Sequence, residues 1–579
     1  MHALLIVLAA VAGAVLAPAR AGPSRPAKAA AKRPHIVLLF TDEQDGRTLD
    51  PEHPYYNVVS TPAFESLAST GMNFVRTYTP APQCVPGRVA TFTSLHTHKS
   101  LGWNNGQSLA ADAKTGKLDG NCVKLYSRET CEGWAKAQAV HVKTTLDREL
   151  EQLGWNVTLI GKTDVGATVL ERFPNAWADG WHGGPSLSIL TRSADVRKPT
   201  KGTPISLVNW NKPNGSFPND WRTVEKSVEA LCRFPELYPD GERVFFYSSV
   251  LTPHPPLHTS QKWLDRVNAS ALAAVQPPIG NLSAFHPFDS YMSISKNVAA
   301  PSYPAGYVYN VTESYFSDVA IADHMHGEVL SALERAGLRD DAWVIFISDH
   351  GEQKMERRQM WKNSMFEASA RVPLVIQGPG IKPGTVKEYT SLLDVMPTII
   401  ELAGGTVPEG LDGQSLVPFL FDEETAAEYG VTWSGSRPAP GRPAASQYHS
   451  NMGNTGSFML VKRVDGAEMK LITYGNALPW FNASSYHPQL FNITADRWEQ
   501  TDVSARHPEL VASMSAELEA IIPTQAADLA AKTNDKKVFQ QYFADDMSTW
   551  KIHQKLQRTY KGFTDTDMQK VKLWEATSL

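Results

Sequence analysis

Five short apolar runs recur along the first two thirds of the chain, and each has the length of a buried strand. They begin at His35 (HIVLLF), Trp155 (WNVTLI), Arg243 (RVFFYSSV), Trp343 (WVIFIS) and Val372 (VPLVIQ). The runs are rich in valine, isoleucine and phenylalanine, and they do not alternate with polar residues. This pattern is typical of strands in a parallel sheet that is covered by helices on both faces.

Amphipathic helical stretches separate the apolar runs. Those that begin at Thr144 and Thr312 precede the second and the fourth run, and one that begins at Ser391 follows the fifth. Gly337 is placed to end the stretch from Thr312 as a C-cap. The alternation of strands and helices predicts an α/β fold with a mostly parallel sheet flanked by helices.

The pattern changes after about Leu420. A Pro- and Gly-rich segment, GSRPAPGRPAAS, is followed by shorter strand candidates that begin at Ser457 and Glu468, and then by helical stretches. We therefore expect a main α/β domain over residues 34–420 and a smaller C-terminal α+β domain over residues 421–579.

The N-terminus has the form of a secretory signal peptide. Its apolar run, Ala3 to Leu16, has about 14 residues, whereas roughly 20 are needed to cross a bilayer. An A-x-A cleavage site ends at Ala21, so we expect a signal peptide over residues 1–21 and a flexible segment over residues 22–33. A buried N-terminal helix is the alternative, but the polar stretch that follows would be a poor partner for it. We expect the secretory pathway, with a lysosomal or secreted product and no transmembrane anchor.

Composition and charge narrow the classes of function. Hydrophobic residues make up 42% of the 579 residues, which suffices for a large core and more than one domain. Lysine and arginine number 55 against 60 acidic residues, and the net charge of -5 argues against a general nucleic-acid binder. This balance leaves room for a locally basic pocket that takes an anionic substrate.

The chain has four cysteines, which could pair in an oxidising compartment. Cys122 and Cys131 lie close together in a polar stretch and are the expected disulfide. Cys84 and Cys232 remain, and the sequence alone does not rule out that they pair as well. Sequons fit the secretory route and stand at Asn156, Asn214, Asn268, Asn281, Asn310, Asn482 and Asn492, although Asn156 lies in a predicted strand.

Polar side chains follow four of the five predicted strands. The first runs into Asp42 and Glu43, the second into Lys162, the third into His254, and the fourth into Asp349 and His350. Each has an ordinary explanation, since an aspartate after a strand is often a turn or N-cap residue. Their recurrence at one edge, where open α/β sheets bind ligands, favours a site.

The residue types at this edge indicate its chemistry. Carboxylate oxygens with an imidazole suit a hard divalent cation such as Ca²⁺ or Mg²⁺. A lysine beside that cation suits a tetrahedral anion, because metal and ammonium both stabilise negative oxygen.

The stretch CVPGR, which begins at Cys84, resembles the C-x-P-x-R activation motif of the sulfatase family. Further blocks resemble the family in its own order, across about Pro34 to Leu420. They are TDEQDG near the N-terminus, GK at Gly161, TPHPP at Thr252, SDHGE at Ser348 and WKNSMFEASARVPLVIQGPG at Trp361. The resemblance implies an alkaline-phosphatase-like fold and the hydrolysis of sulfate esters.

The resemblance also implies that Cys84 is oxidised to formylglycine by the formylglycine-generating enzyme. One hydroxyl of the hydrated aldehyde would attack the sulfate sulfur, and the second would then allow sulfate to leave. A serine could perform the first step but lacks the second hydroxyl. Cys84 also precedes a predicted helix whose N-terminal N–H groups would favour an anion.

Roles for the other residues are carried over from the family. Asp42, Asp349 and His350, with modified Cys84, would bind Ca²⁺, ahead of Mg²⁺, and Asp349 would help deprotonate the attacking hydroxyl. Arg88 would hold the hydrate or the metal-ligating carboxylates. Lys162 and Lys362 would bind sulfate oxygens, and His254 would bind sulfate and protonate the leaving alcohol. Glu43 stands where the family usually has aspartate, and whether its longer side chain reaches the ion is left open.

Several stretches resemble one subgroup of the family, lysosomal sulfatases that act on 2-sulfated glucuronate. They are GWNNG at Gly102, FDSYMSISKN at Phe288, and Asp164 in a position where many sulfatases have histidine. The substrate implied is a 2-O-sulfated uronate, whose sulfate would be removed by exo-action during glycosaminoglycan degradation. Its carboxylate would need donors, for which the candidates are Trp103, Asn104, Asn105, Arg357 and Arg358; alternatively GWNNG is only a polar turn.

Two other functions compete with this interpretation. A phosphate or phosphonate monoester hydrolase of the same superfold would use a similar metal and lysines, but such enzymes commonly have Ser or Thr where this chain has Cys84. A non-catalytic, secreted glycan-binding homologue would have no need to keep Cys84, Arg88 and the charged residues named above. The oligomeric state is open.

Overall fold

The computed structural model describes residues 33–542, apart from 167–207, 210–214, 277–278, 282–283, 297, 299–301, 436, 450–454 and 476–485. The expected signal peptide lies outside the described residues, as do all but the last residue of the segment 22–33 and the sequons at Asn214 and Asn482. Among the described helices, none combines the length and the apolar character needed to cross a bilayer.

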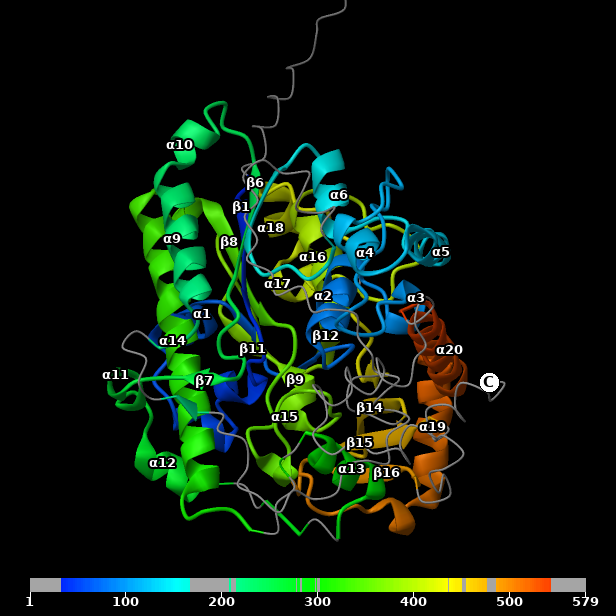
Figure 1. Cartoon of the computed structure of the whole chain (residues 1–579). Coiled ribbons are helices and arrows are strands. Elements are labelled where there is room, and N and C mark those ends of the chain that lie inside the picture. The colour runs from blue at the N-terminus through cyan, green and yellow to red at the C-terminus, as the bar shows by residue number, and fades with distance from the viewer. Residues whose placement is uncertain are drawn as a thin grey trace, which may run out of the picture.

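A seven-stranded sheet forms the centre of the molecule (Figure 1), and its strands are arranged in the order β11-β2-β10-β8-β1-β6-β4. Its strands are β11 (Gly384–Val386), β2 (Met72–Phe74), β10 (Leu374–Gln377), β8 (Ala342–Ser348), β1 (His35–Thr41), β6 (Val244–Ser249) and β4 (Asn156–Gly161). The four strands from β8 to β4 are parallel, with Phe40 opposite both Ile347 and Ser249. Four of the five predicted strands are therefore confirmed as parallel neighbours.

The fifth predicted run differs from the expectation because it is split and reversed. Pro373 lies between β9 (Arg371–Val372), which joins a small sheet with β3 (Thr77–Tyr78) and β12 (Thr390–Ser391), and β10, which pairs antiparallel with β8. Proline has no N–H to donate to a ladder, which suits a break between two sheets. Leu374, the first residue of β10, lies opposite Ile347 near the carboxyl end of β8, so the chain re-enters the sheet from that end and runs backwards.

Helices cover both faces of the central sheet (Figure 1). Helices α2 (Cys84–Thr93), α6 (Leu146–Gln152) and α16 (Val395–Leu402) pack on one face, whereas α1 (Pro62–Thr70), α9 (Pro218–Cys232) and α14 (Tyr307–Arg335) pack on the other. Along β1, Ile36 and Leu38 contribute to the first core and Val37 and Leu39 to the second. Successive strand residues point to opposite faces, so a continuous apolar run is what a strand buried on both faces requires.

A second, antiparallel sheet forms the C-terminal α+β part, as expected. It contains β13 (Ala444–Tyr448), β14 (Ser457–Val464), β15 (Ala467–Tyr474) and β16 (Gln489–Asn492) and is covered by α19 (Pro508–Ile521), with α20 (Thr524–Tyr542) following along the chain. Phe421, Ala426 and Val431 nevertheless pack in a core of the central sheet. The boundary between residues 420 and 421 stays a prediction.

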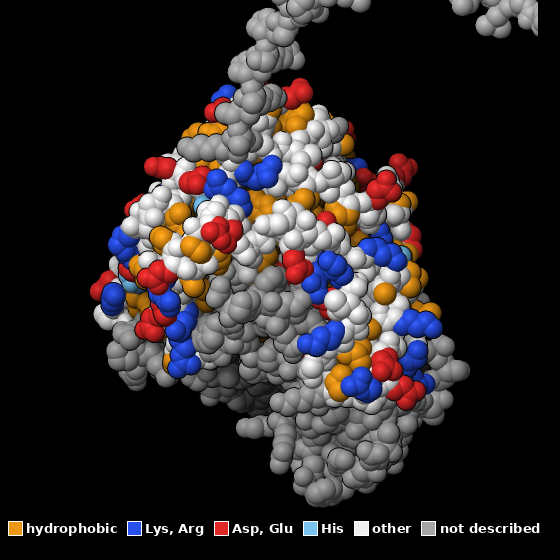
Figure 2. All heavy atoms as spheres, turned by 90° about the horizontal axis from the view of Figure 1, so that it is seen from above, with side chains coloured by type: hydrophobic (Ala, Val, Ile, Leu, Met, Phe, Trp, Pro, Cys, Tyr) orange, Lys and Arg blue, Asp and Glu red, His pale blue; other side chains and the backbone are white. Residues whose placement is uncertain are grey.

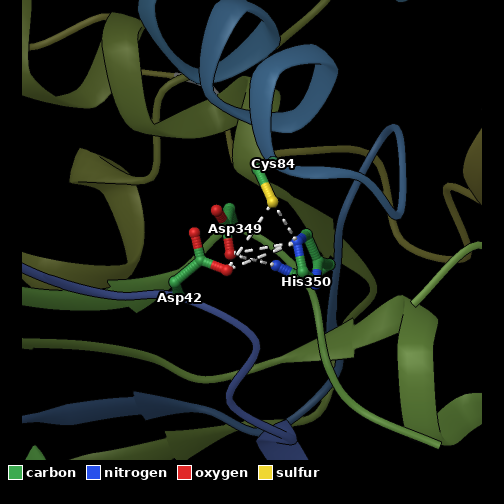
Figure 3. Close-up of side chains that lie close together, drawn as sticks. All are labelled: Asp42, Cys84, Asp349 and His350. Atoms are coloured by element: carbon green, nitrogen blue, oxygen red, sulfur yellow. Dashed lines mark hydrogen bonds and ion pairs between the residues drawn. The ribbon is translucent and has the colours of Figure 1, made fainter. Parts of the chain in front are cut away.

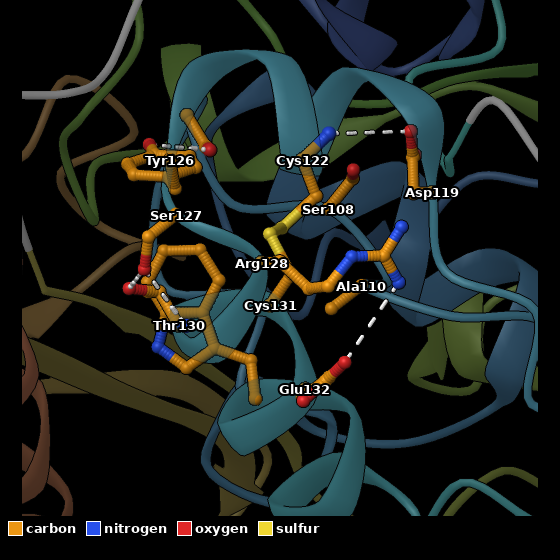
Figure 4. Close-up of a disulfide and its surroundings, with 12 residues drawn as sticks. Ser108, Ala110, Asp119, Cys122, Tyr126, Ser127, Arg128, Thr130, Cys131 and Glu132 are labelled. Atoms are coloured by element: carbon orange, nitrogen blue, oxygen red, sulfur yellow. Dashed lines mark hydrogen bonds and ion pairs between the residues drawn. A yellow bond between two sulfur atoms is a disulfide. The ribbon is translucent and has the colours of Figure 1, made fainter.

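The predicted disulfide is confirmed, and it joins two short helices. Cys122 of α4 (Gly120–Leu125) is bonded to Cys131 of α5 (Arg128–Gln138) (Figure 4). The oxygen of Ser127 accepts a hydrogen bond from the backbone N–H of Thr130 at 3.1 Å and caps α5. Cys84 is buried, Cys232 is exposed, and both are free thiols. The second disulfide that the sequence left possible, between these two, is therefore not formed.

Removing this disulfide is expected to lower the free energy of unfolding by about 2–3 kcal/mol, because the bridge closes a loop of 9 residues and limits the unfolded chain. The variant is Cys131→Ser, measured by urea unfolding against the unaltered protein. Cys232→Ser is the matched control, because this exposed thiol has no partner sulfur and its loss should change stability by less than about 0.5 kcal/mol. Equal effects of the two substitutions would contradict the prediction.

The surface carries both signs of charge. On the face drawn in Figure 2, lysine and arginine side chains are interspersed with aspartate and glutamate over its described part.

Candidate active site

Four parallel strands bring their polar residues to one edge of the sheet, as predicted. Asp42 and Glu43 follow β1, Lys162 follows β4, and Asp349 and His350 follow β8. His254 lies in the loop that follows β6, and all of these strands are neighbours in the sheet.

Cys84 is the first residue of α2, which begins above this edge. Its side chain is 3% exposed, and its sulfur lies 3.3 Å from His350 Nε2 and 3.7 Å from Asp42 Oδ1. Gly87 permits this approach of the helix, because a Cβ there would lie 3.1 Å from the Asp349 carbonyl oxygen and 3.1 Å from that of Ala81. The N-terminus of α2 thus lies at the polar edge. However, the Val85 N–H donates to Asn105 Oδ1 at 3.2 Å, the Gly87 N–H donates to the Gln83 carbonyl at 2.8 Å, and Pro86 has no N–H, so these three positions offer no free donor to an anion.

Asp42, Cys84, Asp349 and His350 form one compact group (Figure 3). Each offers a ligand atom, these atoms lie within 4.8 Å of one another, and all four residues are buried. Burial, followed by the charge of Asp42, raises the pKa of Asp349 to about 6. Two buried carboxylates that repel each other, beside an imidazole, form a donor set that fits a divalent cation.

Arg88 bridges the two carboxylates from inside the fold. It is fully buried, and its Nε lies 2.7 Å from Asp349 Oδ2 while Nη2 lies 3.2 Å from Asp42 Oδ2. Nη1 donates to the oxygens of Tyr247 at 2.9 Å and Ser249 at 3.0 Å. The sequence left open whether Arg88 would hold the hydrate or the metal-ligating carboxylates, and in the structure it contacts both carboxylates.

Lys162 lies between two acids. Its Nζ contacts Asp42 Oδ2 and lies 3.2 Å from Asp164 Oδ2. Burial alone would raise the pKa of Asp42, but the charges of Lys162 and Arg88 hold it well below its usual range. Asp42 is therefore ionised and its charge is shared between two cations.

Glu43 faces Lys362 and His254. Its Oε2 lies 2.9 Å from Lys362 Nζ and 3.2 Å from His254 Nε2, and its Oε1 accepts the Lys362 N–H at 3.0 Å. Burial would raise the pKa of Glu43, but Lys362 and then His254 lower it to about 2. Asp42, Glu43 and His254 form a second group with ligand atoms within 4.8 Å of one another, next to the first.

A cavity of about 490 Å³ opens over the sulfur of Cys84. Lys162, Asp164 and His254 line it with Cys84, while Asp42 and Asp349 are buried below. The rest of the wall is formed by Val85, Asn105, Phe217, Asn219, Asp220, Thr223, Ser249, Leu251, Pro255 and Pro256. The volume lies within the range of small-molecule sites, about 300–1,000 Å³.

The residues suggested to bind a substrate carboxylate differ in whether they line the cavity. Asn105 lines the cavity, and its Oδ1 accepts the Val85 N–H at 3.2 Å. Asn104 instead closes a local turn by accepting the Gly106 N–H at 2.9 Å, and Trp103 packs on His449.

Neither of the two suggested arginines lines the cavity. The guanidinium of Arg357 lies 3.3 Å from Asp289 Oδ2 and also donates to the Glu499 carbonyl. Arg358 donates to the Gly280 carbonyl at 3.0 Å.

Sequence reasoning missed the residues that support this site from below. Tyr247 and Ser249 are two positions apart on β6, so both side chains point to the face covered by α2, where they accept hydrogen bonds from Arg88. Their polar groups inside an apolar run were the available signal. Lys296 was missed as well, although it is buried and donates to the Lys362 carbonyl at 2.6 Å.

Comparison with known proteins places this geometry in a family. The sulfatase family model matches residues 34–405. Arylsulfatase K of Homo sapiens is 30% identical over 550 residues, which cover 92% of this chain and 90% of the relative. Arylsulfatase K of Xenopus laevis is 28% identical over 523 residues, with coverage of 87% and 85%.

Solved structures share the fold. The 2-O GAG sulfatase BT1596 aligns with a TM-score of 0.56 and 17% identity over 85% of this chain and 92% of its own. A phosphonate monoester hydrolase from Silicibacter pomeroyi aligns with a TM-score of 0.59 and 19% identity over 85% and 96%. The family match over residues 34–405 and the relatives that cover most of the chain show that this protein belongs to the sulfatase family, whose members hydrolyse sulfuric esters.

Proposed function

We propose that this sulfatase works through a formylglycine made from Cys84 and a bound Ca²⁺ ion, and that it removes 2-O-sulfate from uronate residues. The observation that carries the proposal is the placement of Cys84 at the start of α2, within 3.7 Å of Asp42 and His350 and open to the cavity. When formed, the hydrated aldehyde supplies two hydroxyl groups, one to attack sulfur and one to release sulfate.

Ca²⁺ would be held by Asp42, Asp349 and His350, together with the oxygen that replaces the Cys84 sulfur. This donor set is dominated by hard oxygens, which favours Ca²⁺ or Mg²⁺ over softer metals. The ion would stabilise negative oxygen on the sulfate group. Glu43 is held by Lys362 and His254, so we assign it to the support of those two side chains rather than to the ion.

The sulfate group would lie between the two lysines. The Nζ of Lys162 contacts Asp42 and Asp164, and that of Lys362 contacts Glu43 and His254 Nε2, which leaves one N–H of each ammonium group for sulfate oxygens. His254 lines the cavity and is 23% exposed at its side chain, so it can reach the bridging oxygen and protonate the leaving alcohol.

Arg88 and Asp349 would act on the nucleophile. Arg88 fixes both carboxylates, while Asp349 Oδ1 accepts N–H groups from Glu43 at 3.1 Å and from His350 at 2.9 Å. A carboxylate held in this way can accept a proton from the attacking hydroxyl without moving.

The substrate class rests on the subgroup resemblance, which extends over 92% of the chain in the match to human arylsulfatase K. The secretory route, ending in the lysosome or outside the cell, is supported by the Cys122–Cys131 disulfide, because disulfides persist in oxidising compartments. The phosphonate hydrolase alternative shares the fold, but the family match over residues 34–405 and the arylsulfatase relatives favour a sulfatase.

A panel of defined saccharides tests the substrate. We expect 2-sulfoglucuronate at the non-reducing end to be hydrolysed with a kcat/KM at least about tenfold above 2-sulfoiduronate or 6-sulfoglucosamine, because one well-placed polar contact is worth roughly 1.4 kcal/mol. Released sulfate is measured by ion chromatography. A phosphonate monoester, 4-nitrophenyl phenylphosphonate, is the probe for the alternative chemistry, and its hydrolysis is followed by the nitrophenolate released. Equal rates on the three saccharides, or a preference for the amino sugar, would defeat the uronate assignment and leave the sulfatase activity intact.

A further inference from the structure

The loop that carries His254 has few backbone N–H groups that could fix its conformation by hydrogen bonds. Residues 251–256 read LTPHPP, so only Leu251, Thr252 and His254 have a backbone N–H. The His254 N–H donates to the Leu251 carbonyl at 3.0 Å, which closes a turn within the loop. The other two N–H groups must therefore anchor the loop to the rest of the protein.

Both of these N–H groups bind one carboxylate, that of Asp220. Its Oδ1 accepts the Leu251 N–H at 2.8 Å, and its Oδ2 accepts the Thr252 N–H at 2.8 Å and the Thr252 hydroxyl at 2.6 Å. The Ser216 hydroxyl donates to the same Oδ2 at 3.3 Å. Asp220 is 4% exposed and lies in the first turn of α9, which packs on the sheet, so the anchor is rigid.

The ring of His254 depends on the path of this loop. Its Nδ1 contacts the carbonyl of Pro255, one residue on, so an Nδ1–H that donates there leaves Nε2 for other partners. Nε2 lies 3.2 Å from Glu43 Oε2 and contacts Lys362 Nζ, on the side where sulfate would bind. A shift of the loop would move the ring with it, because Pro255 and Pro256 restrict the backbone on one side of His254.

We propose that Asp220 is a positioning residue that fixes the loop of residues 251–256 and thereby aims His254 at the leaving oxygen of the substrate. This inference rests on the proposed role of His254 as the proton donor. Asp220 also forms part of the cavity wall, but its oxygens accept from four neutral donors, so it acts through the loop and not on the substrate. Asp318 of α14 accepts the His258 N–H at 3.2 Å and anchors the loop at its far end, so Asp220 governs the end nearer to His254.

The dependence of rate on the leaving group distinguishes positioning from a general structural role. A sugar alcohol leaves only when it is protonated, whereas a nitrophenolate leaves readily without a proton. Asp220→Asn should lower kcat on a sulfated saccharide by about 10–100-fold, because a misplacement of about 1 Å can cost about 10²-fold. On 4-nitrophenyl sulfate the loss should stay below about threefold, and KM on both substrates should change little, since the sulfate contacts of Lys162 and Lys362 remain.

The experiment compares four variants of the matured full chain on both substrates. His254→Ala gives the pattern expected when the proton donor is lost. Asp323→Asn is the matched control, because Asp323 of α14 is a buried carboxylate on the same face of the sheet as Asp220. It accepts a backbone N–H from Phe64 of α1 at 2.8 Å and pairs with Arg266 at 3.4 Å instead of holding residues 251–256. Thr252→Val removes one donor to Asp220 and keeps the other, so it should show the same selective loss at a smaller size. Thr252→Val tests the positioning role of Asp220 if thermal unfolding shows that Asp220→Asn does not fold.

The outcomes separate the inference from the function on which it rests. A selective loss in Asp220→Asn and Thr252→Val that parallels His254→Ala, with Asp323→Asn unaffected, supports it. Equal losses on both substrates, or none, in the two loop variants while His254→Ala is selective overturn the positioning role alone. If His254→Ala is itself not selective, the proton-donor role of His254 is wrong and the inference falls with it.

Discussion

Replacing Cys84 with serine is expected to lower turnover by at least about 10⁴-fold while the fold is kept, because loss of a catalytic nucleophile costs about this much or more. A serine hydroxyl fits where the thiol stands at the start of α2, so the buried surroundings need not change. It can attack the sulfate sulfur once, which releases the sugar alcohol and leaves a sulfate ester on the side chain. It has no second hydroxyl to expel that sulfate, so the reaction should stop after one turnover.

Mass spectrometry of the peptide around position 84 checks both halves of this expectation. In the unaltered enzyme the peptide should carry an aldehyde in place of the thiol, and in Cys84→Ser, after exposure to substrate, it should gain the mass of one SO₃ group. Cys232→Ser should match the unaltered enzyme in turnover, since that thiol is exposed on the last residue of α9. A fully active enzyme whose Cys84 peptide is unmodified would refute the formylglycine assignment.

The edge of the sheet that holds the site could be predicted because two independent signals agree there. Continuous apolar runs identify strands buried on both faces, and parallel strands present their carboxyl ends together. The order of the strands could not be predicted from the sequence; in the structure β1 and β8 are adjacent, which brings Asp42 and Asp349 together. Cys84 required the motif, because it reaches the same edge from a helix and not from a strand.

The direction in which Glu43 points could not be predicted from residue spacing. It follows Asp42 directly, and its backbone has a φ of 73°, in the left-handed region that side chains other than glycine seldom adopt. This conformation turns its carboxylate toward Lys362 and His254, whereas Asp42 faces Cys84. Neighbours in sequence therefore serve different halves of the site.

Arg357, suggested for a substrate carboxylate, does not line the cavity, and its contacts could not be predicted from spacing either. Its partners, Asp289 and the Glu499 carbonyl, lie 68 and 142 residues away along the chain and hold the two terminal nitrogens of the guanidinium inside the fold. A charged residue beside catalytic residues in the sequence is a candidate only until its long-range contacts are known.

Loss of Asp349 should have the other large effect, because this side chain serves the metal, the nucleophile and Arg88 together. We expect Asp349→Ala to reduce turnover by at least about 10³-fold and to abolish stoichiometric Ca²⁺ binding. The substitution also leaves the Nε of the fully buried Arg88 without its partner at 2.7 Å. Breaking a buried ion pair in this way typically costs about 3–5 kcal/mol of stability, so a fall in activity of the alanine variant alone would be ambiguous.

Asp349→Asn separates the two causes. Its amide oxygen can still accept from Arg88 Nε, so the variant should unfold closer to the unaltered protein, yet it supplies a neutral ligand in place of a carboxylate and no longer accepts a proton at pH 7. Elemental analysis should find about one Ca²⁺ per chain in the unaltered enzyme and much less in Asp349→Asn at the same free Ca²⁺ concentration. An excess of Ca²⁺ should restore metal content more fully than turnover, because occupancy can be regained by mass action whereas the lost proton acceptor cannot. Stoichiometric zinc without calcium or magnesium, or full turnover in Asp349→Asn, would show that these two roles are wrongly assigned.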